Sequence, residues 1–184
     1  MQDLSEALKV ALQLVGSLDP DLIEIVALSL QVSLTAVAIA GLIGLPLGAV
    51  VAVASFPGRA VVSTIINALM GLPPVVVGLF VYMLLSNSGP FGVLQLLYTP
   101  TAMIIAQAIL VAPIVAALTR QTIVDLKVEH DEQLRVLGRS PLQQTATLLW
   151  EGRHSLLTAL LAGFGRAIAE VGAVLIVGGN INHV

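Results

Sequence analysis

Residues 25–56 read IVALSLQVSLTAVAIAGLIGLPLGAVVAVASF and contain no charged residue. About 20 apolar residues are enough for an α-helix to cross the hydrocarbon core of a bilayer. This run is longer than one straight crossing needs, so we expect a kinked or tilted helix with one end in the membrane interface. Pro46 lies inside the run. The segment predicts an integral membrane protein.

The composition of the whole chain agrees with this interpretation. Of the 184 residues, 57% are hydrophobic and 10% are charged, whereas a soluble domain usually has about 25% charged residues. The formal net charge of −3 gives no indication of a nucleic-acid partner. The chain has no cysteine, and its histidines, His130, His154 and His183, have no ligand-like spacing. We therefore expect no disulfide, no metal site and no cofactor.

Three further apolar runs follow, at residues 61–85, 101–118 and 155–177. They lack the two-residue alternation of transmembrane β-strands. Only helices and closed barrels satisfy their backbone hydrogen bonds in lipid. The sequence therefore predicts an all-α integral membrane protein, a polytopic helical bundle with spans at about 25–56, 61–85, 101–118 and 155–177.

The first 21 residues differ from this apolar domain. Asp3 and Glu6 come before any apolar run, which is not the pattern of a secretory signal. Apolar residues recur at helical spacing between Leu4 and Val15, over a length too short to span a bilayer. We expect residues 1–21 to form an interfacial amphipathic helix and linker; the alternative is a loosely ordered tail. Residues 22–184 would form the transmembrane domain.

The basic residues predict the orientation of the chain. Lys and Arg are enriched in cytoplasmic loops. Four alternating spans put most of them on one side of the membrane: Arg59, Arg120, Lys127, Arg135, Arg139 and Arg153. The N-terminus is therefore expected outside the cell, and the polar stretch 119–154 in the cytoplasm.

That polar stretch contains signals for a short helix-turn-helix. Gly138 is suited to end one helix. Ser140 is a favourable N-cap, Pro141 suits the first helical position, and Gln143 completes a capping box. The alternative is a solvated connecting loop that happens to be helical.

The same stretch resembles the coupling loop of the permeases of type I ABC importers. The family pattern is Glu-Ala-Ala, three residues, Gly, nine residues, then Ile-x-Leu-Pro. Glu132 and Gly138 fit it, whereas Gln133 and Leu134 replace the alanines, and Trp150 and Glu151 replace Leu-Pro. The resemblance implies a cytoplasmic coupling helix that inserts into a groove of the ATPase subunit. The residues that it assigns to ATPase coupling are Glu132, Gly138, Ser140, Leu142, Leu148 and Leu149.

Other segments are similar to one branch of this family. Residues 162–173 and 178–181 resemble molybdate, tungstate and sulfate permeases, and residues 67–79 and 99–107 resemble the tungstate branch. The resemblance extends from Leu22 to the end. The family core has five helices, so the last core helix is expected to be missing from these 184 residues.

This resemblance implies a function and partners. The protein would be a multi-pass permease subunit of the cell (inner) membrane that moves a tetrahedral oxyanion, tungstate or possibly molybdate, into the cytoplasm by ATP-driven alternating access. It would form a homodimer in the lipid bilayer and work with an extracytoplasmic substrate-binding protein and an ABC ATPase subunit. The chain contains no phosphate-binding loop, so we expect no enzymatic activity and ATP hydrolysis by a separate subunit.

Charged residues and helix breakers inside the apolar runs are candidates for the translocation path. Arg166 and Glu170 are four residues apart, so they share one helical face. Charges within spans usually face a bundle interior or a water-filled path, and this pair would line or gate that path. The alternative is a pair that satisfies itself and orders the helix. Gly71, Pro73 and Pro74 form a denser break, which we also assign to the path.

Several interpretations stay open at this point. Pro46 and Pro113 are either hinges or simply tolerated membrane prolines, and we expect Gln107 to form an interhelical hydrogen bond. Another small solute such as sulfate is an alternative substrate. A non-transporting membrane scaffold is an alternative function for this truncated form, and co-purification with an ATPase would distinguish the two. An intramembrane hydrolase is disfavoured, because the charged pair has no partnered nucleophile.

Overall fold

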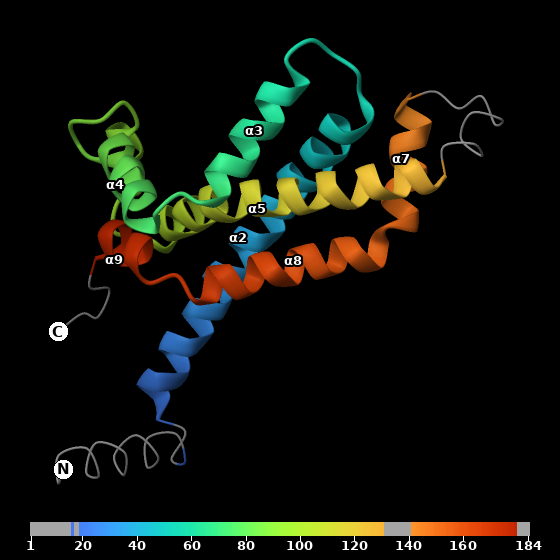
Figure 1. Ribbon diagram of the computed structural model, residues 1–184. Helices are drawn as coiled ribbons and strands as arrows, with labels where there is room; N and C mark the ends of the chain where they lie inside the picture. Colours follow the sequence, from blue (N-terminus) through green and yellow to red (C-terminus); the bar gives the residue numbers. More distant parts are fainter. Residues whose placement is uncertain (1–15, 17–18, 131–140, 180–184) are drawn as a thin grey trace, which may run out of the picture.

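The computed structural model describes residues 16, 19–130 and 141–179, with the side chains of Pro141 and Leu142 left out. Within these residues the chain forms helices and no strand (Figure 1). The elements are α2 (Pro20–Val53), α3 (Arg59–Met70), α4 (Pro74–Leu85), the short 3-10 helix η1 (Gly92–Leu94), α5 (Pro100–Glu129), α7 (Pro141–Glu151), α8 (Arg153–Ile168) and α9 (Gly172–Gly178). The predicted all-α fold is confirmed. The predicted interfacial helix in residues 1–21 lies almost entirely outside the described residues.

The two long helices, α2 and α5, form the central pair of the bundle (Figure 1). Glycines on α2 let their backbones approach closely. A Cβ atom on Gly44 would lie 2.9 Å from the Cβ of Val115, and one on Gly48 would clash with the carbonyl oxygen of Ala116. Small residues commonly allow such close packing between membrane helices, where lipid supplies no hydrophobic drive. Both helices run on past their internal prolines, Pro46 and Pro113.

The other apolar runs are bent pairs of helices. α3 and α4 meet at 101°, and α8 and α9 meet at 60°. The break predicted at Gly71–Pro74 is confirmed, because α3 ends at Met70 and α4 begins at Pro74. The bend inside the predicted run 155–177 was not expected. By length and composition, two helices are long enough to span a membrane, and four spans result if each bent pair counts as one.

Helix bounds differ from the predicted spans at two places. α2 begins at Pro20 rather than near Ile25, because the Oδ1 atom of Asp19 accepts a hydrogen bond from Asp21 N at 3.0 Å. Asp19 thus caps the helix, and Pro20 suits its first position. α5 continues to Glu129, so residues 119–129, which we placed in the polar loop, extend the third span.

One end of the bundle is held by cations and by α7. Arg59 donates from Nε to Val51 O at 2.8 Å and from Nη2 to Ala52 O at 2.7 Å. Lys127 donates from Nζ to Val53 O at 3.2 Å. Cations are favourable at a helix C-terminus, where carbonyls lack helical partners. The last turn of α2 is therefore fixed to both α3 and α5.

α7 is seated on this same end. Leu148 is 1% exposed and belongs to a buried cluster with Ala49 and Val53 of α2 and Ile123 of α5. A Cβ atom on Gly152 would lie 3.0 Å from the Cδ1 atom of Leu126. α7 is thus packed against the ends of α2 and α5 by its apolar face.

Candidate functional site

The two helices that follow the breaks, α4 and α9, lie against each other. Figure 1 shows α4 and α9 side by side at the end of the bundle opposite α7. A Cβ atom on Gly78 would lie 2.8 Å from Ala173 Cα, and one on Gly172 would lie 3.2 Å from the Cγ2 atom of Val75. α4 and α9 therefore touch nearly backbone to backbone, each within its first turns. The structure brings together two bends that lie about 100 residues apart in the chain.

Glu170 stands in the second break. Its Oε1 atom accepts a hydrogen bond from Ala173 N at 2.9 Å, which caps the start of α9. Its Oε2 atom lies 3.7 Å from the Nη2 atom of Arg166. The predicted ion pair between Arg166 and Glu170 is thus formed. Arg166 lies in α8 and Glu170 lies just after its end, so the pair is not on one continuous helix. The side chain of Glu170 is 4% exposed and that of Arg166 is 37% exposed, so the carboxylate is the buried partner.

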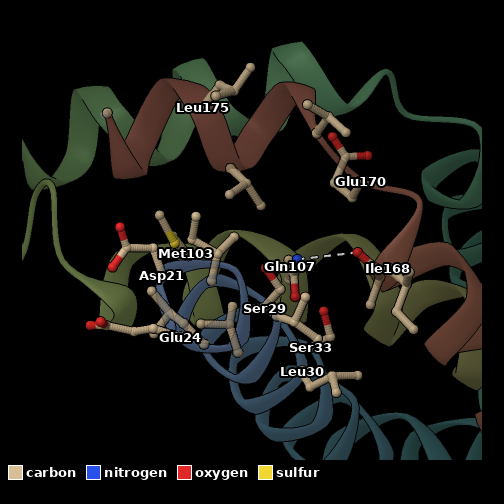
Figure 2. A pocket seen from close by; sticks show the side chains of 18 residues that line it. Asp21, Glu24, Ser29, Leu30, Ser33, Met103, Gln107, Ile168, Glu170 and Leu175 are labelled. Atoms are coloured by element: carbon tan, nitrogen blue, oxygen red, sulfur yellow. Dashed lines mark hydrogen bonds between the residues drawn. The ribbon is translucent and has the colours of Figure 1, made fainter. Parts of the chain in front are cut away.

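A cavity of about 930 Å³ opens beside this break. Its walls come from the first half of α2, from α5 and from the bend between α8 and α9. Figure 2 shows Ser29 and Ser33 of α2 and Gln107 of α5 lining it, with Glu170 also at its wall. Asp21 and Glu24 lie where α2 begins. Most of the other lining residues are apolar.

Gln107 connects α5 to the bend. Its side chain is buried, with the residue 4% exposed, and its Nε2 atom donates to the carbonyl oxygen of Ala167 at 3.2 Å (Figure 2). The predicted interhelical hydrogen bond is confirmed. Within the described part of the chain, the Oε1 atom of Gln107 is buried and has no hydrogen-bond partner.

The charges around the cavity are acidic. Glu170, Asp21 and Glu24 line it, whereas no Lys or Arg does so among the described residues. Arg166 contacts Glu170 from outside this lining. The described residues also hold no group of three or more His, Cys, Asp or Glu placed to bind a metal ion. Acidic side chains at such a surface disfavour tight binding of a dianion.

The structure separates the predicted path residues. Glu170 lines the cavity, but Gly71, Pro73, Pro74 and Arg166 do not. Two lining residues were missed by the sequence analysis, Ser29 and Ser33. Their spacing of four residues on one face of an apolar helix is the signal that could have identified them.

The predicted coupling residues are only partly visible. Glu132, Gly138 and Ser140 lie outside the described residues. Leu142 is in α7, and its side chain is outside the description. Leu148 is a buried residue of α7 and contacts the ends of α2 and α5. Leu149 of α7 is partly buried against the same cluster of residues. These two leucines therefore fix α7 to the bundle.

Comparisons with known proteins add an independent line of evidence. Residues 44–182 match the family described as binding-protein-dependent transport system inner membrane component. The tungstate uptake system permease protein TupB of Peptoclostridium acidaminophilum is 42% identical over 181 residues, which are 98% of this chain and 79% of the relative. A probable anion ABC transporter permease protein of Haloferax volcanii is 42% identical over 160 residues, 87% of this chain and 69% of the relative. The sulfate transport system permease protein CysW of Escherichia coli K12 is more distant, at 28% identity over 170 residues, 89% of this chain and 58% of the relative.

Proposed function

The chain belongs to the family of binding-protein-dependent transport system inner membrane components, and on this premise we propose that it is the permease subunit of an ABC importer for tungstate. The observation that carries the substrate is the 42% identity to a tungstate uptake permease over 98% of the chain. Sulfate permeases are more distant, at 28–29% identity. The protein is a multi-pass membrane component of a transport system, and molybdate is its expected weaker substrate.

The proposal includes the other subunits. An ABC ATPase hydrolyses ATP, an extracytoplasmic binding protein delivers the anion, and two copies of this chain enclose the path. α7 is the part of the cytoplasmic coupling loop that meets the ATPase. Its seat on the ends of α2 and α5 supports this role, because a push on α7 reaches both long helices directly. Residues 22–184 form the proposed permease domain.

The lining of the cavity favours a passage for the anion rather than a site that binds it tightly. A permease that bound a dianion strongly would release it slowly, and the acidic lining avoids this outcome. Selectivity then belongs mainly to the binding protein. Glu170 and the bend that it caps are proposed to gate the path together with the break at Gly71, Pro73 and Pro74, because the helix after that break, α4, packs against α9.

Tungsten accumulation tests the proposed substrate. Cells that lack this gene, grown at limiting tungstate, should lose most of their tungsten uptake, and the restored gene should recover it. Elemental mass spectrometry measures the cellular metal. Molybdate should compete less well than tungstate, and sulfate least. If tungsten accumulation were unchanged and sulfate uptake fell, tungstate would be the wrong substrate, although the protein would still be a permease.

Cysteine labelling tests the orientation. The chain has no native cysteine, so single introduced cysteines give no background. Asp21→Cys and Ser88→Cys should react with a membrane-impermeant maleimide in intact cells, whereas Arg139→Cys should react only after the cells are opened. This pattern is expected because Arg59 and Lys127 lie together at the other end of the bundle from Asp21 and Glu24. Labelling of Arg139→Cys in intact cells would reverse the topology.

A further inference from the structure

We propose that Gln107 is the positioning residue that holds the bend between α8 and α9, and that α5 carries movements of α7 to this bend through it. The inference deepens the proposed function and has two parts. The first part, that Gln107 holds the bend, is argued from geometry alone. The second part, that α5 couples α7 to the bend, rests on the proposed function as an ABC permease.

Gln107 donates its hydrogen bond to a carbonyl oxygen that has lost its usual helical donor at the bend. In an uninterrupted helix, Ala167 O would accept from Val171 N, four residues on. Here it accepts from Glu170 N at 3.2 Å and from the Nε2 atom of Gln107 at 3.2 Å. A carbonyl oxygen has two lone pairs, so these two donors satisfy it. The amide of Gln107 must present its nitrogen, because its oxygen would face another acceptor.

Glu170 performs the complementary task on the other side of the bend. Ala173 N would donate to Ala169 O in a continuous helix, and instead it donates to the Oε1 atom of Glu170 at 2.9 Å. The break thus releases backbone groups that two buried side chains satisfy. In a membrane such groups must find partners. Glu170 belongs to the bend itself, whereas Gln107 is supplied by another helix, so Gln107 is the contact through which α5 acts on the bend.

α5 is one helix from this contact to the cluster that contacts α7, and Pro113 lies inside this stretch. Gln107 and Ile123 are 16 residues apart, a length of about 24 Å along the helix axis. Ile123 is fully buried in the cluster that seats Leu148 of α7. Lys127, one turn further, is bonded to Val53 O. A displacement of α7 that shifts α5 relative to α8 would change the distance between the Nε2 atom of Gln107 and Ala167 O.

Spin-label distances in the purified full chain test the first part. Labels at Ile25→Cys and Leu175→Cys lie on walls of the cavity formed by α2 and α9, and both positions are about half exposed. In Gln107→Met, the fraction of molecules whose label–label distance differs from the main distance of the unmodified protein should grow by about tenfold, the effect of losing one buried hydrogen bond. Gln107→Asn, whose amide is one methylene too short, should give the same change and decides the matter if the methionine variant does not fold.

Thr119→Val is the matched control. Thr119 is also buried in α5, and its hydroxyl has no hydrogen-bond partner in the described part of the chain. Its replacement should leave the distribution as in the unmodified protein. A distribution unchanged in folded Gln107→Met or Gln107→Asn would overturn the inference, and so would an equal change in Thr119→Val.

A transport measurement tests the second part. In the assembled importer, Gln107→Met should keep ATP hydrolysis within about twofold while the tungstate moved per ATP falls by about tenfold. A merely structural role would lower both together, and that result would overturn the coupling. The two proposals fail separately. If the unmodified protein moves no tungstate but the distance distribution changes in Gln107→Met, the proposed function is wrong. The inference that Gln107 holds the bend is then still supported.

Discussion

Gly48→Val should prevent α2 and α5 from packing and should remove most of the folded protein from detergent extracts of the membrane. A Cβ atom at this position clashes with Ala116 O and would lie 2.8 Å from Thr119 Cβ and 3.0 Å from Arg120 N. Two of these atoms belong to the backbone of α5, so no side-chain movement relieves the contact. We expect a cost of about 3 kcal/mol, the upper part of the range for overpacked cores.

Gly165→Ala is the matched control for this change. Gly165 is a glycine within α8, and an added Cβ atom there meets nothing within 4 Å. Alanine is the better helix former, so this variant should be as stable as the unmodified protein or slightly more stable. Size-exclusion chromatography of a fluorescent fusion, heated in steps, measures both. A Gly48→Val variant as stable as Gly165→Ala would show that α2 and α5 are not packed as described.

Glu170→Ala should lower tungstate uptake by roughly tenfold to a hundredfold at equal membrane expression. The change removes the cap on Ala173 N and the partner of Arg166 in one step. Arg166→Ala should be milder, because Glu170 keeps its hydrogen bond to the backbone. The side chain of Arg166 is 37% exposed, so the loss of its partner does not leave it enclosed in the protein interior. The double variant should resemble Glu170→Ala.

Glu170→Gln separates the two tasks of this residue. The amide oxygen of glutamine can still accept from Ala173 N, but the side chain no longer pairs with a cation as a full charge. Uptake should fall less than in Glu170→Ala if the cap dominates. Uptake assays with radioactive tungstate, normalised to the permease in the membrane, provide the comparison. Full activity in every variant would remove both roles, and greater damage from Arg166→Ala would reverse the assignment.

The sequence predicted the fold class because the signals that control it are local. Long uncharged runs require helices in lipid. Gly71 is a weak helix former, and Pro73 and Pro74 lack the N–H donor that a straight helix needs. The break between α3 and α4 could therefore be placed to the residue. The hydrogen bond of Gln107 was also expected, since a lone amide in an apolar helix needs a partner.

The remaining features depend on tertiary contacts that no local pattern reveals. Nothing in residues 155–177 breaks the backbone as proline does, so the run was predicted to be continuous. At the bend, Glu170 and Gln107 satisfy released backbone groups, and Gln107 comes from another helix, 60 residues away from Ala167 in the chain. Leu148 likewise could be placed on α7 from sequence, but its burial against Ile123 required the packed structure.

Reconstituted importers test the central claim most directly. Proteoliposomes that contain the permease and its ATPase, with binding protein and labelled tungstate outside, should accumulate tungstate only when ATP is present on the ATPase side. Omission of any of the three proteins should abolish the signal. The permease alone should bind tungstate weakly or undetectably, because the cavity is lined by carboxylates and by no Lys or Arg among the described residues. Equal tungstate accumulation with and without ATP, or tight tungstate binding by the isolated permease, would contradict the account.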